Sequence, residues 1–169
     1  GTIKTNKVVI TSGIWGPLMG KKAGVPVPLM PVEHPLLFFG PLPEIQGTEE
    51  LLVYPLLRDQ GNSAYVRDTG RLHGGMLEWG YYEDKEPRLV EPEDIGNPEK
   101  TMISDSMRYL DLEEVAEPLE KAFETTPILN ELGWDEKSSF NGLLSVTPDA
   151  GSLIGESPEV RGFWLCEAV

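Results

Sequence analysis

The alternation of apolar and polar positions predicts short strands joined by turns over most of the chain. Near the start, residues 5–12 form a β-branched run closed by Gly13, which is typical of a buried strand. Three further runs predict strands at 51–54, 64–67 and 76–79, with turns at 59–62 and 69–70. Because short strands at hairpin spacing form antiparallel sheets, this region predicts a sheet with one covered face and one face open to a ligand.

One segment, residues 111–125, has the spacing of an amphipathic helix. Its apolar positions fall on one face, namely Leu112, Val115, Ala116, Leu119, Ala122 and Phe123. Asp111, with Glu114 three residues on, favours a capping box at the start. Pro118 predicts a kink, or a break into two shorter helices. A short helical turn at 127–132 and a strand at 134–146 are expected to follow.

Prolines and glycines punctuate the remaining segments. Prolines at 26, 28 and 31 exclude residues 23–34 from the centre of a sheet, so an edge or crossing strand is expected there. Residues 83–106 are acidic and proline-containing, which predicts a long loop. Residues 141–164 alternate Gly or Pro with short apolar runs and predict strands separated by turns. An ordinary series of surface hairpins has the same composition.

Composition narrows the classes of function. The 169 residues carry a net charge of −14, which argues against nucleic acid and against an anionic membrane surface as partners. No apolar run approaches the roughly 18 residues of a membrane span. The single cysteine, Cys166, excludes an internal disulfide, favours a reducing compartment and is expected to be a buried, inert thiol. The acidic helix positions have no His or Cys near them, so no metal site is predicted.

Two motifs resemble one family. T-P-D at 147–149, followed by I-G, a short acidic turn and R-G-F-W-L, resembles the C-terminal flavin-side segment of the D-amino-acid-oxidase-like amine oxidoreductases. The flanking N-G and G-E-S-P-E-V-R-G are most similar to the sarcosine and dimethylglycine dehydrogenase branch. T-x-K-V-V-I-x-x-G-I-W, which begins at residue 5, resembles the last parallel strand of that family's FAD-binding domain.

The resemblance implies FAD as cofactor and assigns residues to it. Gly13, Trp15, Thr147, Pro148 and Asp149 are expected to contact the flavin. A glycine that merely ends a strand, with a tryptophan packed on it, is the structural alternative for the first two. A strand that ends in small residues where a helix begins is also the usual place for a ligand in an α/β sheet.

The same resemblance implies catalytic roles for His34 and Tyr65, beside the flavin and facing the substrate. A satisfied structural histidine and a core tyrosine are the alternatives. Arg58 and Arg67 are expected either to pair with a substrate carboxylate or to be solvated charges at strand ends.

Three departures from the family pattern qualify these expectations. Leu144 stands where glycine-oxidase-like members carry a carboxylate-binding Arg, and Pro35-Leu36 replaces the usual Gln or Ala and Tyr after the His. The fingerprint G-x-G-x-x-G is absent, so the chain is expected to be a fragment that lacks the N-terminal flavin-binding segment and holds FAD weakly.

The predicted fold class is α+β: an antiparallel substrate-binding sheet with a flanking helix, plus strands of an incomplete FAD-binding α/β domain. Residues 1–22 and 138–169 are assigned to the flavin domain, and 23–137 to the substrate domain. The predicted function is oxidation of a secondary or tertiary N-methyl amine by hydride transfer to flavin. A non-catalytic substrate-domain module and an acidic interaction domain remain alternatives. Self-association through an exposed strand at 8–10 and a cytoplasmic location, or the mitochondrial matrix in a eukaryote, are also expected.

Overall fold

The computed structural model of the chain describes residues 1–82 and 86–168, so the first three residues of the predicted loop 83–106 lie outside it. The chain forms two compact units. The first comprises residues 1–33, 88–99 and 143–169, and the second comprises 34–87 and 100–142. Mixed sheets with a few helices confirm the predicted α+β class.

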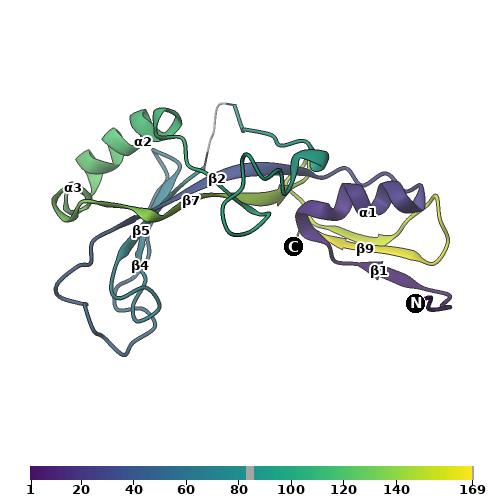
Figure 1. Cartoon of the computed structure of the whole chain (residues 1–169), viewed down its shortest axis with the longest axis horizontal. Coiled ribbons are helices and arrows are strands. Elements are labelled where there is room, and N and C mark those ends of the chain that lie inside the picture. Colours follow the sequence, from purple (N-terminus) through teal and green to yellow (C-terminus); the bar gives the residue numbers. More distant parts are fainter. Residues whose placement is uncertain (83–85, 169) are drawn as a thin grey trace. The chain divides into compact units, whose positions relative to one another are not determined.

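The first unit is built on a three-stranded sheet with the order β1-β9-β8 (Figure 1). Its strands are β1 (Val8–Ile10), β8 (Leu153–Glu156) and β9 (Phe163–Glu167); β1 runs parallel to β9, and β8 runs antiparallel to it. A single turn of 3-10 helix, Gly13–Trp15, leads from β1 into α1 (Gly16–Ala23). The core of this unit comprises Ile10, Val25, Val27, Leu29 and Phe163.

Gly20 lets α1 lie close to the chain that follows it. A Cβ at this position would collide with the carbonyl oxygen of Val25 and with the side chain of Val27. The helix ends at Gly24, whose left-handed backbone (φ +73°) suits glycine at a helix C-terminus.

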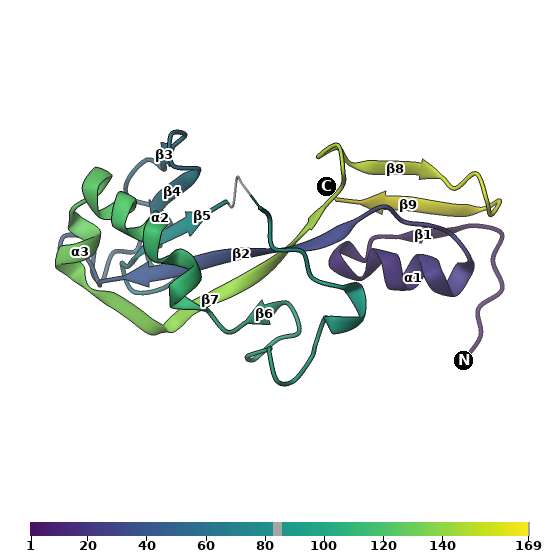
Figure 2. The ribbon, with the colours of Figure 1, turned by 90° about the horizontal axis from the view of Figure 1, so that it is seen from above.

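The second unit contains most of a six-stranded sheet with the order β3-β4-β5-β2-β7-β6. The strands are β2 (Met30–Phe39), β3 (Leu57–Asp59), β4 (Ala64–Asp68), β5 (Leu77–Tyr81), β6 (Met107–Arg108) and β7 (Trp134–Val146). The pairs β3–β4, β4–β5, β5–β2 and β6–β7 are antiparallel. The long strands β2 and β7 lie side by side and belong to both units (Figure 2).

Two helices cover one face of this sheet. They are α2 (Leu112–Thr125) and α3 (Ile128–Leu132). Their buried residues Val115, Ala122 and Leu129 join a core with the inward side chains of the strands, among them Leu37, Phe39, Ala64, Val66, Leu77, Trp79 and Tyr81. Because successive strand residues point to opposite faces, the residues between these ones point away from the helices.

The structure confirms the predicted helix and shows Asp111 at its N-cap. A carboxylate oxygen of Asp111 accepts a hydrogen bond from the backbone N–H of Glu113 at 3.0 Å. The helix runs unbroken past Pro118, so the predicted division into two helices is wrong. Pro118 removes one backbone hydrogen bond, whereas the buried Val115 and Ala122 on either side hold both turns against the sheet.

One predicted strand is wrong. Residues 51–54 are irregular, and the nearest strand begins instead at Leu57. The four side chains of the segment are exposed, while the backbone N–H groups of Val53 and Tyr54 donate to the buried carboxylate of Asp68. This carboxylate takes the place of a partner strand, which the apolar run did not reveal.

The edge position expected for residues 23–34 is also wrong, because β2 lies between β5 and β7. Pro26 and Pro28 precede the strand, and the ladder with β5 covers only Leu36–Phe39, so Pro31 lies outside it. The expectation of a crossing strand fits better, since β2 contributes residues to both compact units.

The compact units have different bounds from the predicted domains. The divisions fall after residues 33 and 142 rather than 22 and 137, and residues 88–99 join the first unit. The assignment of a flavin domain and a substrate domain stays a prediction.

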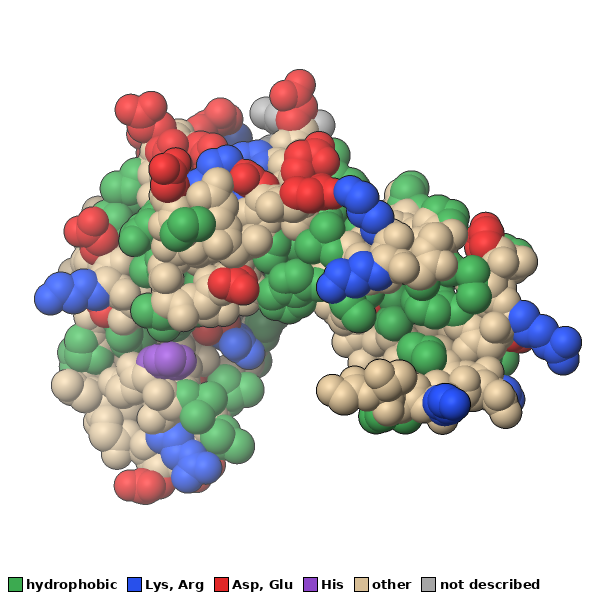
Figure 3. All heavy atoms as spheres, turned by 45° about the vertical axis from the view of Figure 1, so that its right-hand side comes forward, with side chains coloured by type: hydrophobic (Ala, Val, Ile, Leu, Met, Phe, Trp, Pro, Cys, Tyr) green, Lys and Arg blue, Asp and Glu red, His purple; other side chains and the backbone are tan. Residues whose placement is uncertain are grey.

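On the surface of the second unit, acidic side chains gather where α2 lies (Figure 3), among them the exposed Glu113, Glu117 and Glu120.

Candidate functional site

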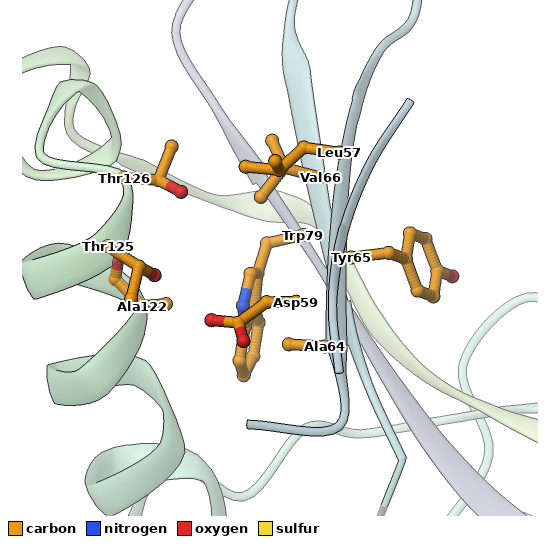
Figure 4. Close-up of a pocket in the computed structure, with 9 residues that line it drawn as sticks. All are labelled: Leu57, Asp59, Ala64, Tyr65, Val66, Trp79, Ala122, Thr125 and Thr126. Carbon is orange, nitrogen blue, oxygen red and sulfur yellow. The ribbon is translucent and has the colours of Figure 1, made fainter. Parts of the chain in front are cut away.

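The face of the larger sheet opposite α2 carries a row of aligned residues. Strand register places Arg58 of β3 opposite Tyr65 of β4, Tyr65 opposite Gly80 of β5, and Gly80 opposite Leu36 of β2. Directly paired residues point to the same face of a sheet. Figure 4 shows Tyr65 projecting away from α2, while Trp79 lies on the helix side, in a pocket between α2 and the sheet.

An aromatic cluster of His34, Tyr65 and Tyr82 forms on this open face. The imidazole Nε2 of His34 lies 3.1 Å from the hydroxyl oxygen of Tyr65, at hydrogen-bond distance. The ring centroids of His34 and Tyr82 are 4.5 Å apart, and those of Tyr65 and Tyr82 are 5.8 Å apart. The structure therefore brings together the two predicted catalytic residues and adds a third ring.

Gly80 makes room for this arrangement. The ring of Tyr65 lies directly over Gly80, and a Cβ there would overlap the ring and its hydroxyl. Gly80 has ordinary strand geometry, so the need for glycine comes from the close approach of a side chain.

Burial sets the protonation of the cluster. His34 is 8% exposed, and its burial lowers the pKa of the imidazole; the backbone of Tyr81 acts in the opposite direction, and the positive charge of Arg58 lowers the pKa further. Burial also raises the pKa of Tyr65 to about 12, with a smaller contribution from Glu78. A lowered imidazole pKa and a raised phenol pKa both favour the neutral forms, and the tautomer of His34 decides which of the two groups donates the hydrogen bond.

The two arginines of this face differ in their partners. Arg67 donates through Nε to the carboxylate of Glu78, which lies directly opposite it in β5. Arg58 instead places its guanidinium over the ring of Tyr82, 4.8 Å from the centroid. Within residues 1–82 and 86–168, no acidic side chain pairs with Arg58.

In the first unit, the predicted flavin residues Gly13 and Trp15 share one turn, and a buried carboxylate holds that turn. Glu167 is 1% exposed and accepts from the Ser12 N–H at 2.8 Å, the Ser12 hydroxyl at 2.7 Å and the Gly13 N–H at 2.6 Å. Gly13 has a positive φ of +54°, which favours glycine.

This turn suits a flat cofactor. A Cβ at Gly13 would meet no atom within 4 Å, so the space beside the backbone is open. Trp15 is 38% exposed and offers an apolar ring surface next to it. The open space at Gly13 suits the edge of an isoalloxazine, the flat ring system of a flavin, and the exposed Trp15 ring suits its face.

The predicted residues Thr147, Pro148 and Asp149 form a second turn, between β7 and β8. The Thr147 hydroxyl donates to the Gly151 carbonyl at 2.6 Å, and the Asp149 carboxylate accepts from the Gly151 N–H at 3.1 Å. This N–H, with the Thr147 hydroxyl, lowers the pKa of Asp149. Both polar side chains are thus engaged within their own turn, which leaves mainly backbone groups for a ligand.

Sequence reasoning missed two residues of these sites. Tyr82 is two residues beyond Gly80, which is paired with Tyr65, so strand alternation would have predicted that Tyr82 lies on the same face as Tyr65. Glu167 is a charged residue within the otherwise apolar end of β9, a pattern that signals a buried, hydrogen-bonded carboxylate. Cys166, next to it, is half-buried, so the expectation of a buried thiol is wrong.

The described part of the chain contains neither a metal-binding cluster nor a membrane-spanning helix. No group of three His, Cys, Asp or Glu side chains there is arranged to hold a metal ion. Among the described helices, none combines the length and the apolar composition that a bilayer span requires.

The fold is similar to that of two solved structures, a glycine oxidase and an L-proline dehydrogenase. Over 99% of the chain and 37% of the other protein, it superposes on the crystal structure of glycine oxidase from Geobacillus kaustophilus with a TM-score of 0.64 at 20% identity. L-proline dehydrogenase from P.horikoshii gives a TM-score of 0.68 at 19% identity, over 98% of this chain and 38% of that one.

The family model for FAD dependent oxidoreductases (DAO) matches residues 1–168, so the chain belongs to this family, whose cofactor is FAD. It is 34% identical over 169 residues to human mitochondrial sarcosine dehydrogenase. It is 28% identical over 165 residues to mitochondrial dimethylglycine dehydrogenase of Rattus norvegicus. Each alignment covers 98% of this chain but only 16% and 18%, respectively, of those relatives.

Proposed function

We propose that this chain forms the amine-facing sheet and part of the flavin-binding site of an FAD-dependent dehydrogenase for secondary or tertiary N-methyl amines of the sarcosine or dimethylglycine type. The observation that carries the proposal is the hydrogen bond between His34 Nε2 and Tyr65 on the uncovered sheet face, with Tyr82 beside it. A neutral base next to aromatic rings is suited to an N-methyl ammonium group.

The cluster has two tasks in this proposal. The rings of Tyr65 and Tyr82 contact the N-methyl groups, because the positive charge of an ammonium group is attracted to the face of an aromatic ring. Neutral His34, through Nε2 and the Tyr65 hydroxyl, accepts the ammonium proton, because the amine must be unprotonated for its carbon–hydrogen bond to break. FAD, when bound, supplies the acceptor for the hydride that leaves this carbon.

On the cofactor side, the Gly13–Trp15 turn and the Thr147–Asp149 turn would hold the flavin. Gly13 lets the cofactor approach the backbone, and Trp15 packs against it. The side chains of Thr147 and Asp149 keep their turn rigid through Gly151. Pro148 contributes a fixed φ to the same turn.

The names of the relatives support the substrate class. Dimethylglycine dehydrogenase, sarcosine dehydrogenase and, at 29% identity, 4-methylaminobutanoate oxidase of Paenarthrobacter nicotinovorans all act on amines that carry a methyl group on nitrogen, as their names state. Leu144, in β7, replaces the carboxylate-binding Arg of glycine-oxidase-like proteins, which favours the N-methyl branch. The proposed setting is a reducing compartment, the cytoplasm or the mitochondrial matrix; the names of both dehydrogenases include the word mitochondrial.

The test joins this chain to the dinucleotide-binding segment of rat dimethylglycine dehydrogenase and follows flavin absorbance without oxygen. We expect retained FAD and bleaching by sarcosine or N,N-dimethylglycine. Tyr65→Phe should slow bleaching by about tenfold or more, since it removes the hydroxyl that links substrate and His34. The exposed Tyr54→Phe is the matched control. A flavin-loaded protein that no N-methyl amine bleaches would refute the proposal and favour a non-catalytic module.

A further inference from the structure

A buried indole donor in the core of the second unit has no acceptor. Trp79 of β5 is fully buried, and within the described ranges its Nε1–H donates to no group. The half-buried Trp134 differs, since its Nε1–H donates to the hydroxyl of Ser139 at 2.7 Å. A buried N–H without an acceptor costs stability, and native cores rarely leave one unsatisfied. The Trp79 donor therefore requires a partner on the side of the sheet that faces α2.

Trp79 lines a small pocket between the sheet and α2. Asp59 of β3 and Thr125 of α2 line the same pocket, and Figure 4 shows Trp79 and Asp59 on the helix side of the sheet. The short side chains of Ala64 and Ala122, which also line it, keep the space open. The volume open to a water-sized sphere is about 10 Å³. This is close to the minimum for one water molecule and far below the volume of a pocket for an organic ligand.

Asp59 supplies an acceptor at this pocket. Its carboxylate accepts from the backbone N–H of Asn62 at 3.2 Å and from the side-chain amide of Asn62 at 2.7 Å. The Asn62 amide is the main group that lowers the pKa of Asp59, so the carboxylate is charged at neutral pH. A carboxylate offers about four acceptor positions, so Asn62 does not exhaust them.

We infer that this pocket binds one ordered water molecule, which accepts the N–H of Trp79 and donates to the Asp59 carboxylate and the Thr125 hydroxyl oxygen. The Thr125 hydroxyl lies 3.3 Å from the carbonyl oxygen of Ala122, to which it donates, so its own oxygen is able to accept. An indole N–H disfavours a cation, and a carboxylate disfavours an anion. Water is the ligand of this size that satisfies all three groups, and three partners are usual for a buried water.

The water joins an edge strand to the helix. β3 has only three residues and lies at the end of the described sheet, where β4 is its partner strand. Leu57 is 47% exposed, so apolar packing holds this strand weakly. Residue 58 points to the opposite face, where the Arg58 guanidinium lies over the ring of Tyr82. The water thus fixes, from the core side, a strand that reaches the aromatic cluster, and this role does not depend on the proposed amine chemistry.

The test is an NMR measurement of magnetisation transfer from water to the indole N–H groups of the ¹⁵N-labelled chain. We expect a cross-peak of direct dipolar contact at Trp79 Nε1–H and none of comparable strength at Trp134, whose N–H is bound to Ser139. Asp59→Val should abolish the Trp79 cross-peak and accelerate exchange of this N–H with solvent by about tenfold or more. Asn62→Ala is the matched control, because it removes the amide that binds Asp59 but keeps the carboxylate, and it should retain the cross-peak.

Thr125→Val separates a bound water from the hydroxyl beside it, since an exchangeable hydroxyl proton gives a similar signal. If the Trp79 cross-peak persists in this variant, water is its source and the inference stands. If it disappears there, its source is the hydroxyl and the inference is refuted. No cross-peak at Trp79 in the wild-type chain, or one that Asp59→Val leaves unchanged, also refutes it. A well-dispersed spectrum shows that a variant is folded, and the wild-type and Thr125→Val measurements decide the question if Asp59→Val does not fold.

Discussion

Replacing Glu167 tests whether one carboxylate holds the predicted cofactor turn. Glu167 is 1% exposed and accepts three hydrogen bonds, at 2.8, 2.7 and 2.6 Å, two of them from backbone N–H groups. In Glu167→Ala the part-buried donors of Ser12 and Gly13 lose their acceptor. Each unsatisfied donor costs about 1–3 kcal/mol, and the alanine also leaves a void beside Gly16. We expect a loss of about 3–5 kcal/mol in the free energy of unfolding.

Glu167→Gln gives a graded version of the same test. Glutamine keeps the volume and one acceptor oxygen, but its amide group directs N–H donors at a backbone N–H. We therefore expect a smaller loss of about 1.5–3 kcal/mol. Exposed Glu99→Ala, in the same unit, removes a carboxylate that holds no such turn and should change stability by less than about 0.5 kcal/mol.

Denaturant unfolding followed by tryptophan fluorescence measures these losses, since Trp15 lies in the turn itself and Trp164 in β9. Hydrogen exchange of the Ser12 and Gly13 amides gives a local measure and should accelerate strongly in Glu167→Ala. If Glu167→Ala loses less than about 1 kcal/mol and these amides stay protected, the carboxylate is not what holds the turn.

Three further perturbations test other parts of the structure. Gly80→Ala should displace the Tyr65 ring, break its bond to His34 and destabilise the chain by about 1–3 kcal/mol, and Tyr65→Phe should then add little, as a double-mutant cycle of unfolding free energies will show. The pKa of the Tyr65 phenol is raised to about 12, so between about pH 10 and 12 the folded chain keeps a proton that the unfolded chain releases. The free energy of unfolding should therefore fall as the pH rises across this window, and it should fall less in Tyr65→Phe. Denaturant titrations at several pH values measure the difference. Val9, 60% exposed on the terminal strand of its sheet, should mediate self-association, so Val9→Lys should lower the weight-average mass in sedimentation. Ile103→Lys, at an apolar position in the other unit that is 88% exposed, should not.

The local pattern of apolar residues was sufficient to predict a helix or strand where one face of that element packs against a core. The apolar spacing of α2 and the alternation of β4 and β5 predicted these elements within one or two residues, because burial against the sheet selects those very positions. The same alternation implied that Tyr65 lies opposite the helix face. The open face was thus predictable before the order of the strands was known.

Long-range contacts account for what the sequence did not show. Residues 51–54 look like a strand, but the Asp68 carboxylate, more than a dozen positions away, binds their backbone instead. The central place of β2 depends on which segments of its ten residues are paired, and a count of prolines does not give this. The role of Glu167 was not predicted for the same reason, since its hydrogen-bond partners Ser12 and Gly13 are at the other end of the chain.

The proposed fit of the open face to an amine depends on a local conflict within the sheet. A buried strand position ordinarily carries an apolar side chain, yet this face has the glycine Gly80, a tyrosine lying over it and a histidine that is 8% exposed. Burying the imidazole costs stability in acid, because its pKa is lowered and folding must exclude the proton that the unfolded chain binds below about pH 6.5. An apolar residue at position 34 would remove that cost. The retained cost is intelligible if the sheet needs a neutral proton acceptor next to aromatic rings, and this is the requirement that amine oxidation imposes.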